Sequence, residues 1–336
     1  MSSSGLGIRR SKAYYFWWKS AFVCAVLLSM SALYYSTAKV DYVWRWYRVP
    51  QYFYYEKTVD VTSDVEGDVS AVIKEGKTAK VEVKGLDGET AVYQIPEGTI
   101  TVQRGDMISP GDPLGYYKEW RVGLLMVGLW ITLKVSFLAI ILGIIIGLAT
   151  GLARISDNPA FKWSAITYIE LIRGSPLLVQ IFIWYFVFGT LVNSMLMRNG
   201  FDQVSPMVFG VLSLAFFAGA YIAEIVRAGI QSIHRGQVEA ARSLGLNGTQ
   251  CMIHVVLPQA FRRILPPLAG QFISLVKDSS LLGLIAIREL TKATREVVTT
   301  SLQPFELWFL CAILYLVLTF ALSMLLQHME KRMVNS

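Results

Sequence analysis

An apolar run at residues 123–153, GLLMVGLWITLKVSFLAIILGIIIGLATGLA, limits what the chain can fold into. A helix needs about 20 such residues to cross the hydrocarbon core of a bilayer, so this run can span a membrane with some tilt. Hydrophobic residues make up 54% of the 336 positions and charged residues 16%, more apolar than a typical soluble protein. The sequence therefore predicts a polytopic membrane protein.

Glycines in this run are spaced for helix packing. Gly143, Gly147 and Gly151 lie on one face of the expected helix, where small residues let a second helix approach closely. The alternative is that glycine is simply common in membrane spans. Further spans are predicted near residues 165–192, near 208–225, from the Pro266-Pro267 pair onward, and near 307–327.

The first 39 residues predict a sixth span. Four basic residues, Arg9, Arg10, Lys12 and Lys19, precede an apolar stretch that ends near Tyr35. Such a start can be a cleaved signal peptide, but counted from Phe16 the stretch is long enough for an anchor helix. Both interpretations place the following segment outside the cytoplasm, and the anchor is preferred. The fold class is therefore an all-α polytopic membrane protein, with five helices after one N-terminal anchor.

Residues 40–119 differ from the rest of the chain. They are polar, carry fourteen acidic and nine basic residues, and contain no apolar run of membrane length. KTAKVEVKG, TAVYQIP and GTITVQRGD alternate between apolar and polar residues, and LDGET and SPGDPLG are typical of turns. The sequence predicts a small, mostly antiparallel β domain outside the membrane. Residues 120–330 then form the membrane domain.

No catalytic residue, metal site or cofactor site is expected. Residues 71–78, AVIKEGKT, differ by one residue from a phosphate-binding GxxxxGK[ST] loop, but Ala71 replaces the first glycine and the flanking pattern is that of strands. Cys24, Cys251 and Cys311 are far apart, with no spacing typical of metal ligands. The chain is not predicted to be an enzyme.

The positions of the basic residues predict how the chain is oriented in the membrane, and they do not require binding to nucleic acid. The net charge is +7, and the segment from Arg227 to Arg263 holds five arginines against Glu239 alone. Lysines and arginines near span ends favour the cytoplasmic side. The amino terminus, Arg154 with Lys162, and Lys331 with Arg332 are also basic. Six spans with both termini in the cytoplasm place all of these clusters on that side.

The basic segment contains GQVEAARSLGLNG at residues 236–248. QVEAARSL favours a helix, and Gly245 is a natural helix stop. Asn247 or Thr249 can cap a second short helix, which Pro258 is expected to end. A short rigid helix outside the bilayer suits a groove on a partner protein, although a helix lying along the membrane surface fits the pattern equally well.

This segment resembles the EAA loop of ABC-transporter permeases of the type I importer class. The matching residues are Gly236, Glu239, Ala240, Ala241, Gly245 and Leu257-Pro258, and the expected loop covers about residues 232–263. TYIELIRGSPLLVQIFIWYF, YIAEIVRAGIQSIHRGQ and LVKDSSLLGLIAIREL are similar to the branch of this family that carries polar amino acids, such as histidine, glutamate, glutamine, arginine and opines. The resemblance covers about residues 123–333, so it does not explain the anchor and the β domain.

The resemblance implies a permease subunit of an ATP-driven amino-acid importer in a bacterial cytoplasmic membrane. Its partners would be two ATPase subunits that bind ATP and hold the EAA helix in a cleft, a solute-binding protein outside, and a second permease. This second permease would be an identical or a similar chain, among membrane lipid. This chain would bind no cofactor. Neither the particular amino acid nor the role of residues 40–119 follows from the sequence.

Charged residues in or near the spans form two groups. Glu170 with Arg173, and Glu224 with Arg227, are three residues apart and can pair on one helix face. Structural pairing is the preferred interpretation, ahead of substrate contact. Lys277, Asp278, Ser279 and Ser280 predict a break in the fourth span of the membrane domain, which would expose backbone groups to a cavity. These four residues would contact a zwitterionic substrate or act in gating.

Two other functions remain open. An ion-coupled secondary transporter would require internal repeats with matched broken helices, and no such pair of segments is evident. A membrane-tethered sensor that binds its ligand through the β domain would leave the many spans unexplained.

Overall fold

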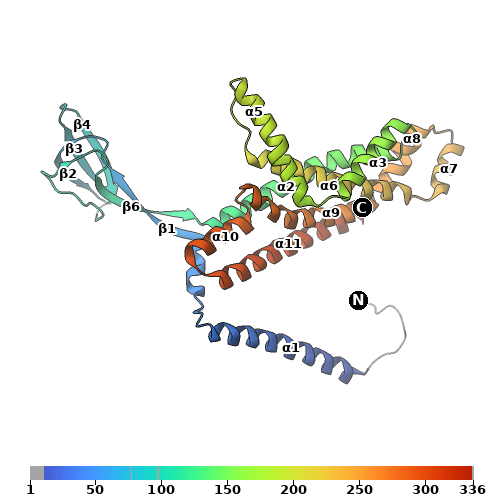
Figure 1. Ribbon diagram of the computed structural model, residues 1–336, viewed down its shortest axis with the longest axis horizontal. Coiled ribbons are helices and arrows are strands. Elements are labelled where there is room, and N and C mark those ends of the chain that lie inside the picture. Colours follow the sequence, from blue (N-terminus) through green and yellow to red (C-terminus); the bar gives the residue numbers. More distant parts are fainter. Residues whose placement is uncertain (1–10, 77, 97, 335–336) are drawn as a thin grey trace. The chain divides into compact units, whose positions relative to one another are not determined.

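The computed structural model describes residues 11–76, 78–96 and 98–334, without the side chains of residue 75 and residues 330–334. It forms two compact units, residues 1–46 and 47–336, which are treated separately (Figure 1). Within the described residues, six helices are long and apolar enough to cross a membrane. The predicted fold class, an anchor and five further spans with a small β domain, is confirmed. Arg9 and Arg10 lie outside the described residues.

Helix α1, Lys12–Lys39, makes up most of the first unit. The Ser11 side chain accepts a hydrogen bond from the Tyr14 N–H at 3.2 Å and caps the helix. Its apolar side chains lie around the whole circumference, and Thr37 is the residue buried within the unit. Trp17 and Trp18 near one end, and Tyr34 and Tyr35 near the other, are exposed. A uniformly apolar helix with aromatic ends is suited to lipid rather than to a protein core.

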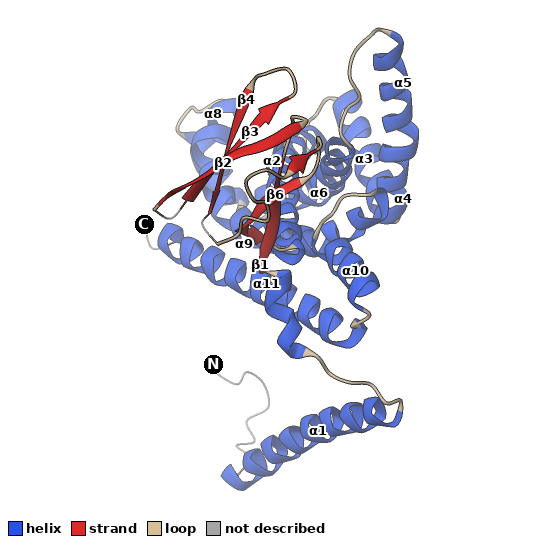
Figure 2. Cartoon of the chain, turned by 90° about the vertical axis from the view of Figure 1, so that its left-hand side faces the viewer, coloured by secondary structure: helices blue, strands red, loops and turns tan. Residues whose placement is uncertain are grey.

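The β domain consists of two antiparallel sheets (Figure 2). After the short 3₁₀ helix η1, Trp46–Tyr52, strand β1, Tyr54–Thr62, pairs with β6, Pro113–Val122, from Tyr54↔Val122 to Thr62↔Pro113. The other sheet has the order β4-β3-β2-β5, with bounds Gly67–Glu75 for β2, Thr78–Gly85 for β3, Thr90–Pro96 for β4 and Met107–Ile108 for β5. Strand β6 therefore extends three residues beyond the predicted domain boundary at residue 119.

The period-two pattern correctly identifies strands β3 and β4. Val81, Val83 and Ile95 point inward and are fully buried, whereas their strand neighbours are more exposed. Residues 98–106 were also expected to form a strand, but beyond the described strands only an isolated bridge, Ile100↔Gly115, is present there. Two glycines with positive φ, Gly105 and Gly111, turn the chain instead. Residues 71–78 cross the β2–β3 hairpin, a context unlike that of a phosphate-binding loop.

The remaining spans begin with α2, Leu124–Arg154, and α6, Pro206–Gln231. The second predicted span, residues 165–192, is wrong in its boundaries. The structure has a short helix α3, Pro159–Arg173, and then a new span made of α4, Leu177–Phe182, the π-helical η2, Ile183–Gly189, and α5, Thr190–Arg198.

The break between α3 and α4 has a local cause. Gly174 ends α3, and Pro176, which has no N–H, stands at the N-cap of α4. The Gln180 side-chain amide turns back and donates to the carbonyl oxygens of Ile172 at 2.7 Å and Ser175 at 3.2 Å. These bonds satisfy carbonyl groups that the end of α3 leaves without a helical partner. Mean hydropathy does not reveal such a break because both sides of it are apolar.

The fourth span of the membrane domain also differs from its prediction. Helix α8, Gly248–Cys251, continues through a π-helical segment η3, Met252–Val256, into α9, Leu257–Asp278. Pro258 therefore does not end a helix, and Pro266 and Pro267 lie inside α9 rather than at its start. In η3 the Leu257 N–H bonds to the Met252 carbonyl, five residues back. This wider turn makes room for a proline ring that would otherwise disrupt the helix.

After α9 the chain forms the 3₁₀ segment η4, Ser279–Ile285, followed by α10, Leu290–Ser301, and the last span α11, Pro304–Val334.

Helices α2 and α6 form the centre of the membrane domain. Gly143, Gly147 and Gly151 are buried against α6. A Cβ atom at Gly147 would lie 2.5 Å from Ile222 Cγ2 and 2.9 Å from the Gly219 carbonyl oxygen. The glycine face therefore allows close packing within this chain.

Replacing Gly147 by alanine is expected to destabilise the membrane domain by about 1–3 kcal/mol, because the added methyl group overpacks this contact. Gly270→Ala in α9 is the matched control, since a Cβ there meets nothing within 4 Å. Thermal unfolding of the purified protein in detergent measures both variants. Equal melting temperatures for G147A and G270A would contradict the packing argument.

Candidate functional site

The EAA segment forms helix α7, Arg235–Ser243, followed by a tight turn. The His234 ring accepts a hydrogen bond from the Gly236 N–H and caps the helix start. At the other end, the Gly245 N–H bonds to the Arg242 carbonyl at 2.9 Å and the Leu246 N–H to the Ala241 carbonyl at 3.2 Å. This pair of bonds is a Schellman motif, which needs a left-handed residue, and Gly245 has φ +85°. The glycine stop predicted from the sequence is therefore present.

A second cap follows immediately after the turn. The Asn247 side chain accepts from the Gln250 N–H, while the Gln250 side chain accepts from the Asn247 N–H, which is a capping box. Of the two capping residues expected, Asn247 is the one observed. Two consecutive caps leave few conformations for residues 244–247, so the angle between α7 and α8 is fixed by local bonds.

Helix α7 is held from one side and exposed on the other. Ala241 is buried in the main apolar cluster, and Val238 and Leu246 pack against that cluster. Arg263 donates to the Ser232 carbonyl at 2.5 Å. Glu239, Ala240, Arg242 and Ser243 are exposed, and Leu244 is 82% exposed. The outer face thus presents a small apolar patch between an acidic and a basic side chain.

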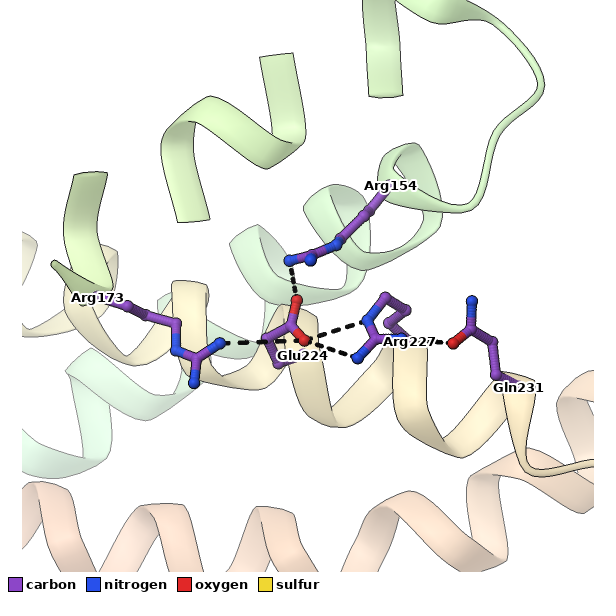
Figure 3. A network of polar contacts seen from close by, with 5 residues as sticks. All are labelled: Arg154, Arg173, Glu224, Arg227 and Gln231. Carbon is purple, nitrogen blue, oxygen red and sulfur yellow. Dashed lines mark hydrogen bonds and ion pairs between the residues drawn. The ribbon is translucent and has the colours of Figure 1, made fainter. Parts of the chain in front are cut away.

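An ion-pair network lies where α2, α3 and α6 meet (Figure 3). The Glu224 carboxylate accepts from Arg154 at the end of α2, and from Arg227 Nη2 at 2.9 Å and Nε at 3.1 Å. Arg173 Nη1 lies 4.0 Å from the same carboxylate, and Arg227 also bonds to Gln231. The Glu224 side chain is only 17% exposed, so several cations around it compensate its burial.

The expected pair within α3 is not found. Arg173 points to Glu224 on α6 instead of to Glu170, and Glu170 is exposed. The expected pairing of Glu224 with Arg227 is present, but sequence reasoning missed Arg154. A partner on another helix, seventy residues away, leaves no local signal in the sequence.

The α-helical conformation of α9 ends within the four residues Lys277, Asp278, Ser279 and Ser280. Helix α9 ends at Asp278, and Ser279 is buried with its hydroxyl bonded to the Val276 carbonyl at 2.8 Å. Lys277 and Ser280 line a cavity of about 280 Å³ with Trp308 and Tyr315. Asp278 and Ser279 are not part of its lining. The cavity thus brings together two of the four residues predicted for the substrate path.

A buried carboxylate, which sequence reasoning also missed, lies next to this cavity. Glu289 caps α10 by accepting from the Thr291 N–H at 2.7 Å and the Lys292 N–H at 2.8 Å, and it accepts from the Tyr315 hydroxyl at 2.9 Å. Burial raises the pKa of Glu289, and these hydrogen bonds oppose that effect. Glu289 thereby positions the hydroxyl groups of Thr291 and Tyr315 at the cavity wall.

The family model described as "Binding-protein-dependent transport system inner membrane component" matches residues 139–335. The chain belongs to this family. It is thus an ABC permease, a multi-pass protein of the inner membrane, which works with a separate ATPase subunit and a binding protein. The predicted family is confirmed, and ATP is bound by the ATPase subunit.

Individual relatives are similar to this permease over nearly their whole length. It is 38% identical to the probable glutamine ABC transporter permease GlnM of Bacillus subtilis, covering 63% of this chain and 94% of that protein. It is 37% identical to the glutamine transport system permease GlnP of Escherichia coli K12, with the same coverage. A solved structure, "Crystal structure of an amino acid ABC transporter with histidines", is 39% identical, with a TM-score of 0.55 over 62% of this chain and 94% of that one.

The family match begins at residue 139, so α1 and the β domain lie outside it. The methionine transporter MetNI shares the fold at a TM-score of 0.52 and 20% identity. The permease domain of this chain is therefore a known architecture, to which an anchor and a β domain are added.

Substitutions at Gly245 test the turn after α7. Gly245→Val is expected to reduce ATP-driven transport and to increase proteolytic cleavage near residue 245, because a β-branched residue disfavours φ +85°. Gly245→Asn is the matched control, since asparagine tolerates the left-handed conformation. Limited proteolysis and uptake into vesicles measure both variants. A valine variant as resistant and as active as the asparagine variant would show that the turn does not require glycine.

The ion-pair network around Glu224 predicts that its loss lowers the stability of the protein. Glu224→Gln is expected to lower the free energy of unfolding by about 1–3 kcal/mol, because it leaves neighbouring arginines without a counter-charge in a partly buried site. Adding Arg154→Gln should recover part of this loss, since one uncompensated cation is removed. Thermal unfolding of the two single variants and the double variant measures the coupling. Strictly additive losses would argue against the network.

Proposed function

We propose that this permease forms the translocation path of an ATP-driven importer for polar amino acids, with glutamine as the first substrate to test. The observation that carries this proposal is the 37–38% identity over 94% of the length of glutamine permeases. Three further relatives are named as permeases for glutamine, cystine or amino acids. The likeness to an amino-acid ABC transporter structure at 39% identity supports the same substrate class.

The orientation of the chain is part of the proposal. Both termini and the loop that carries α7 lie in the cytoplasm, and the β domain lies outside. The distribution of lysine and arginine supports this arrangement, because basic residues near span ends favour the cytoplasmic side. The acidic excess of residues 40–119 fits the outer face. The basic pair Lys331 and Arg332 belongs to the part whose side chains are not described.

Helix α7 acts as the contact with the ATPase. Its exposed face, with Glu239, Ala240 and Leu244, fits a groove in the manner of a short amphipathic helix. Its buried face, through Ala241, rests on the membrane domain. A helix fixed on one side and bound on the other transmits a movement of the ATPase to the spans. A second permease, identical or similar, and surrounding lipid complete the assembly.

The cavity beside Lys277 and Ser280 forms part of the substrate path. The Lys277 ammonium group can bind a substrate carboxylate, and the hydroxyls of Thr291 and Tyr315 can donate or accept hydrogen bonds. Asp278, next to Lys277 in the sequence, does not line this cavity, so it would meet a substrate ammonium group elsewhere along the path. Replacing Asp278 by alanine with transport fully retained would remove Asp278 from the path.

Uptake by vesicles that hold the assembled complex tests the function. Labelled glutamine, histidine, arginine and glutamate are presented with the binding protein, and ATP is supplied inside. Uptake of at least one of them that requires ATP is the expected result. Uptake that follows an ion gradient and persists without ATP would favour a secondary transporter.

Glu239→Lys tests the contact with the ATPase. The variant is expected to lower co-purification of the ATPase and uptake together by about tenfold, the equivalent of about 1.4 kcal/mol at one contact. Arg242→Lys is the control, because it changes a residue on the same exposed face but keeps the positive charge of that residue. Normal co-purification and uptake in the Glu239 variant would contradict the docking role of α7.

Removal of the β domain separates the importer from a tethered sensor. The Ser63 N–H bonds to the Asp112 carbonyl at 3.0 Å, so residues 64–111 can be excised there and closed with a short turn while β1 and β6 stay paired. ATP-driven uptake retained by this variant makes the β domain accessory. Loss of substrate binding with an intact complex would favour the sensor.

A further inference from the structure

A cavity of about 580 Å³ lies beside the Glu224 network, between α3, α6 and α9. Arg173, Arg227 and Arg263 line it, together with Tyr221, Ile225 and Pro267. Among the described residues of its lining, Glu224 alone is acidic. The cavity therefore combines an excess of guanidinium groups with an apolar wall.

Two of these guanidinium groups lack a carboxylate partner at hydrogen-bond distance. The two oxygens of Glu224 already accept from Arg154 and Arg227. Arg173 remains 4.0 Å from this carboxylate, which is too long for a hydrogen bond. Arg263 donates to a neutral backbone carbonyl, that of Ser232. Each guanidinium has five N–H donors, so both residues keep donors for an anion.

The cavity favours an anion over a zwitterionic amino acid. Three arginines line the cavity against the single carboxylate of Glu224, and that carboxylate already accepts from Arg154 and Arg227, so the lining carries a net positive charge. The Tyr221 ring already faces the Arg173 guanidinium, at 5.4 Å. A phosphate group needs only donors, and the planar guanidinium fork matches its oxygen atoms.

The position of the cavity points to a lipid as the source of this phosphate. Arg227 lies four residues before the end of α6, about 6 Å along the helix axis, so the cavity is at the edge of a candidate span. Ile225 and Pro267 add an apolar wall to the charged one. Basic pockets between membrane helices on the cytoplasmic side bind the headgroups of anionic lipids.

We propose that this cavity binds the phosphate group of an anionic phospholipid, with Arg173 and Arg263 as its main donors. Assigning the lipid to the cytoplasmic leaflet rests on the orientation in the proposed function. The geometry of the site does not depend on which solute is transported. Inorganic phosphate offers the same chemistry, and the experiment separates the two sources.

The test uses the full-length chain with its ATPase, purified in a mild detergent. Cardiolipin or phosphatidylcholine is titrated in, and native mass spectrometry counts the lipid bound to each complex. The wild type is expected to retain cardiolipin in preference to phosphatidylcholine. Because each arginine near a phosphate contributes about fivefold to affinity, Arg173→Gln with Arg263→Gln should weaken cardiolipin binding by about 25-fold.

Arg262→Gln is the matched control. Arg262 is the exposed neighbour of Arg263 on the same helix but does not line the cavity, so its loss should leave cardiolipin binding unchanged. A loss in R262Q equal to that in the double variant would show general attraction and overturn the proposal. Cardiolipin binding in the double variant equal to that of the wild type would overturn it as well.

Two further measurements cover the remaining outcomes. Arg173→Lys keeps the charge without the guanidinium fork and should give an intermediate affinity, so it replaces the double variant if that protein does not fold. Millimolar inorganic phosphate should not displace cardiolipin, and complete displacement would assign the site to soluble phosphate and overturn the lipid proposal. Failure of amino-acid uptake with cardiolipin binding intact would contradict the proposed function alone.

Discussion

The close approach of α2 to α6 is the contact on which the rest of the membrane domain depends. Three glycines, Gly143, Gly147 and Gly151, bring the two backbones together, and few other side chains would fit between them. This contact places Arg154, at the end of α2, beside Glu224 on α6. A chain without a hydrophobic driving force between its spans relies on such shape complementarity and on buried polar pairs for its specificity.

The same core supports the EAA helix. Ile230 and Ile233, at and just beyond the end of α6, belong to the apolar cluster that also holds Ala241 and Cys251. The segment that carries α7 is thus joined to the central helix pair through continuous packing rather than through a flexible loop. The β domain has its own apolar cluster, which contains no residue of the membrane domain.

Several features set by neighbouring residues could be predicted, whereas features set by distant partners could not. The stop at Gly245, the cap at Asn247 and the alternation in β3 and β4 follow from local chemistry. The α3–α4 break was missed although Gly174 and Pro176 are local signals for it, because the span was assigned from hydropathy and the residues on both sides are apolar. The Arg173–Glu224 contact, the Glu289 cap and the β1–β6 pairing join elements that only the tertiary fold brings together. Pro258 was misread because η3 accommodates its ring without ending the helix.

The run from Gly248 through η3 to Asp278 has a mechanical consequence. At 1.5 Å per residue it is a rod about 45 Å long, with the α7 turn at one end and Lys277 at the other. A tilt of about 5° around one end moves the opposite end by about 4 Å, on the basis of that rise. The widened turn at η3 and the Pro266-Pro267 pair inside α9 are the two places where such a rod would bend first, so their stiffness sets how much of a movement at one end reaches the other.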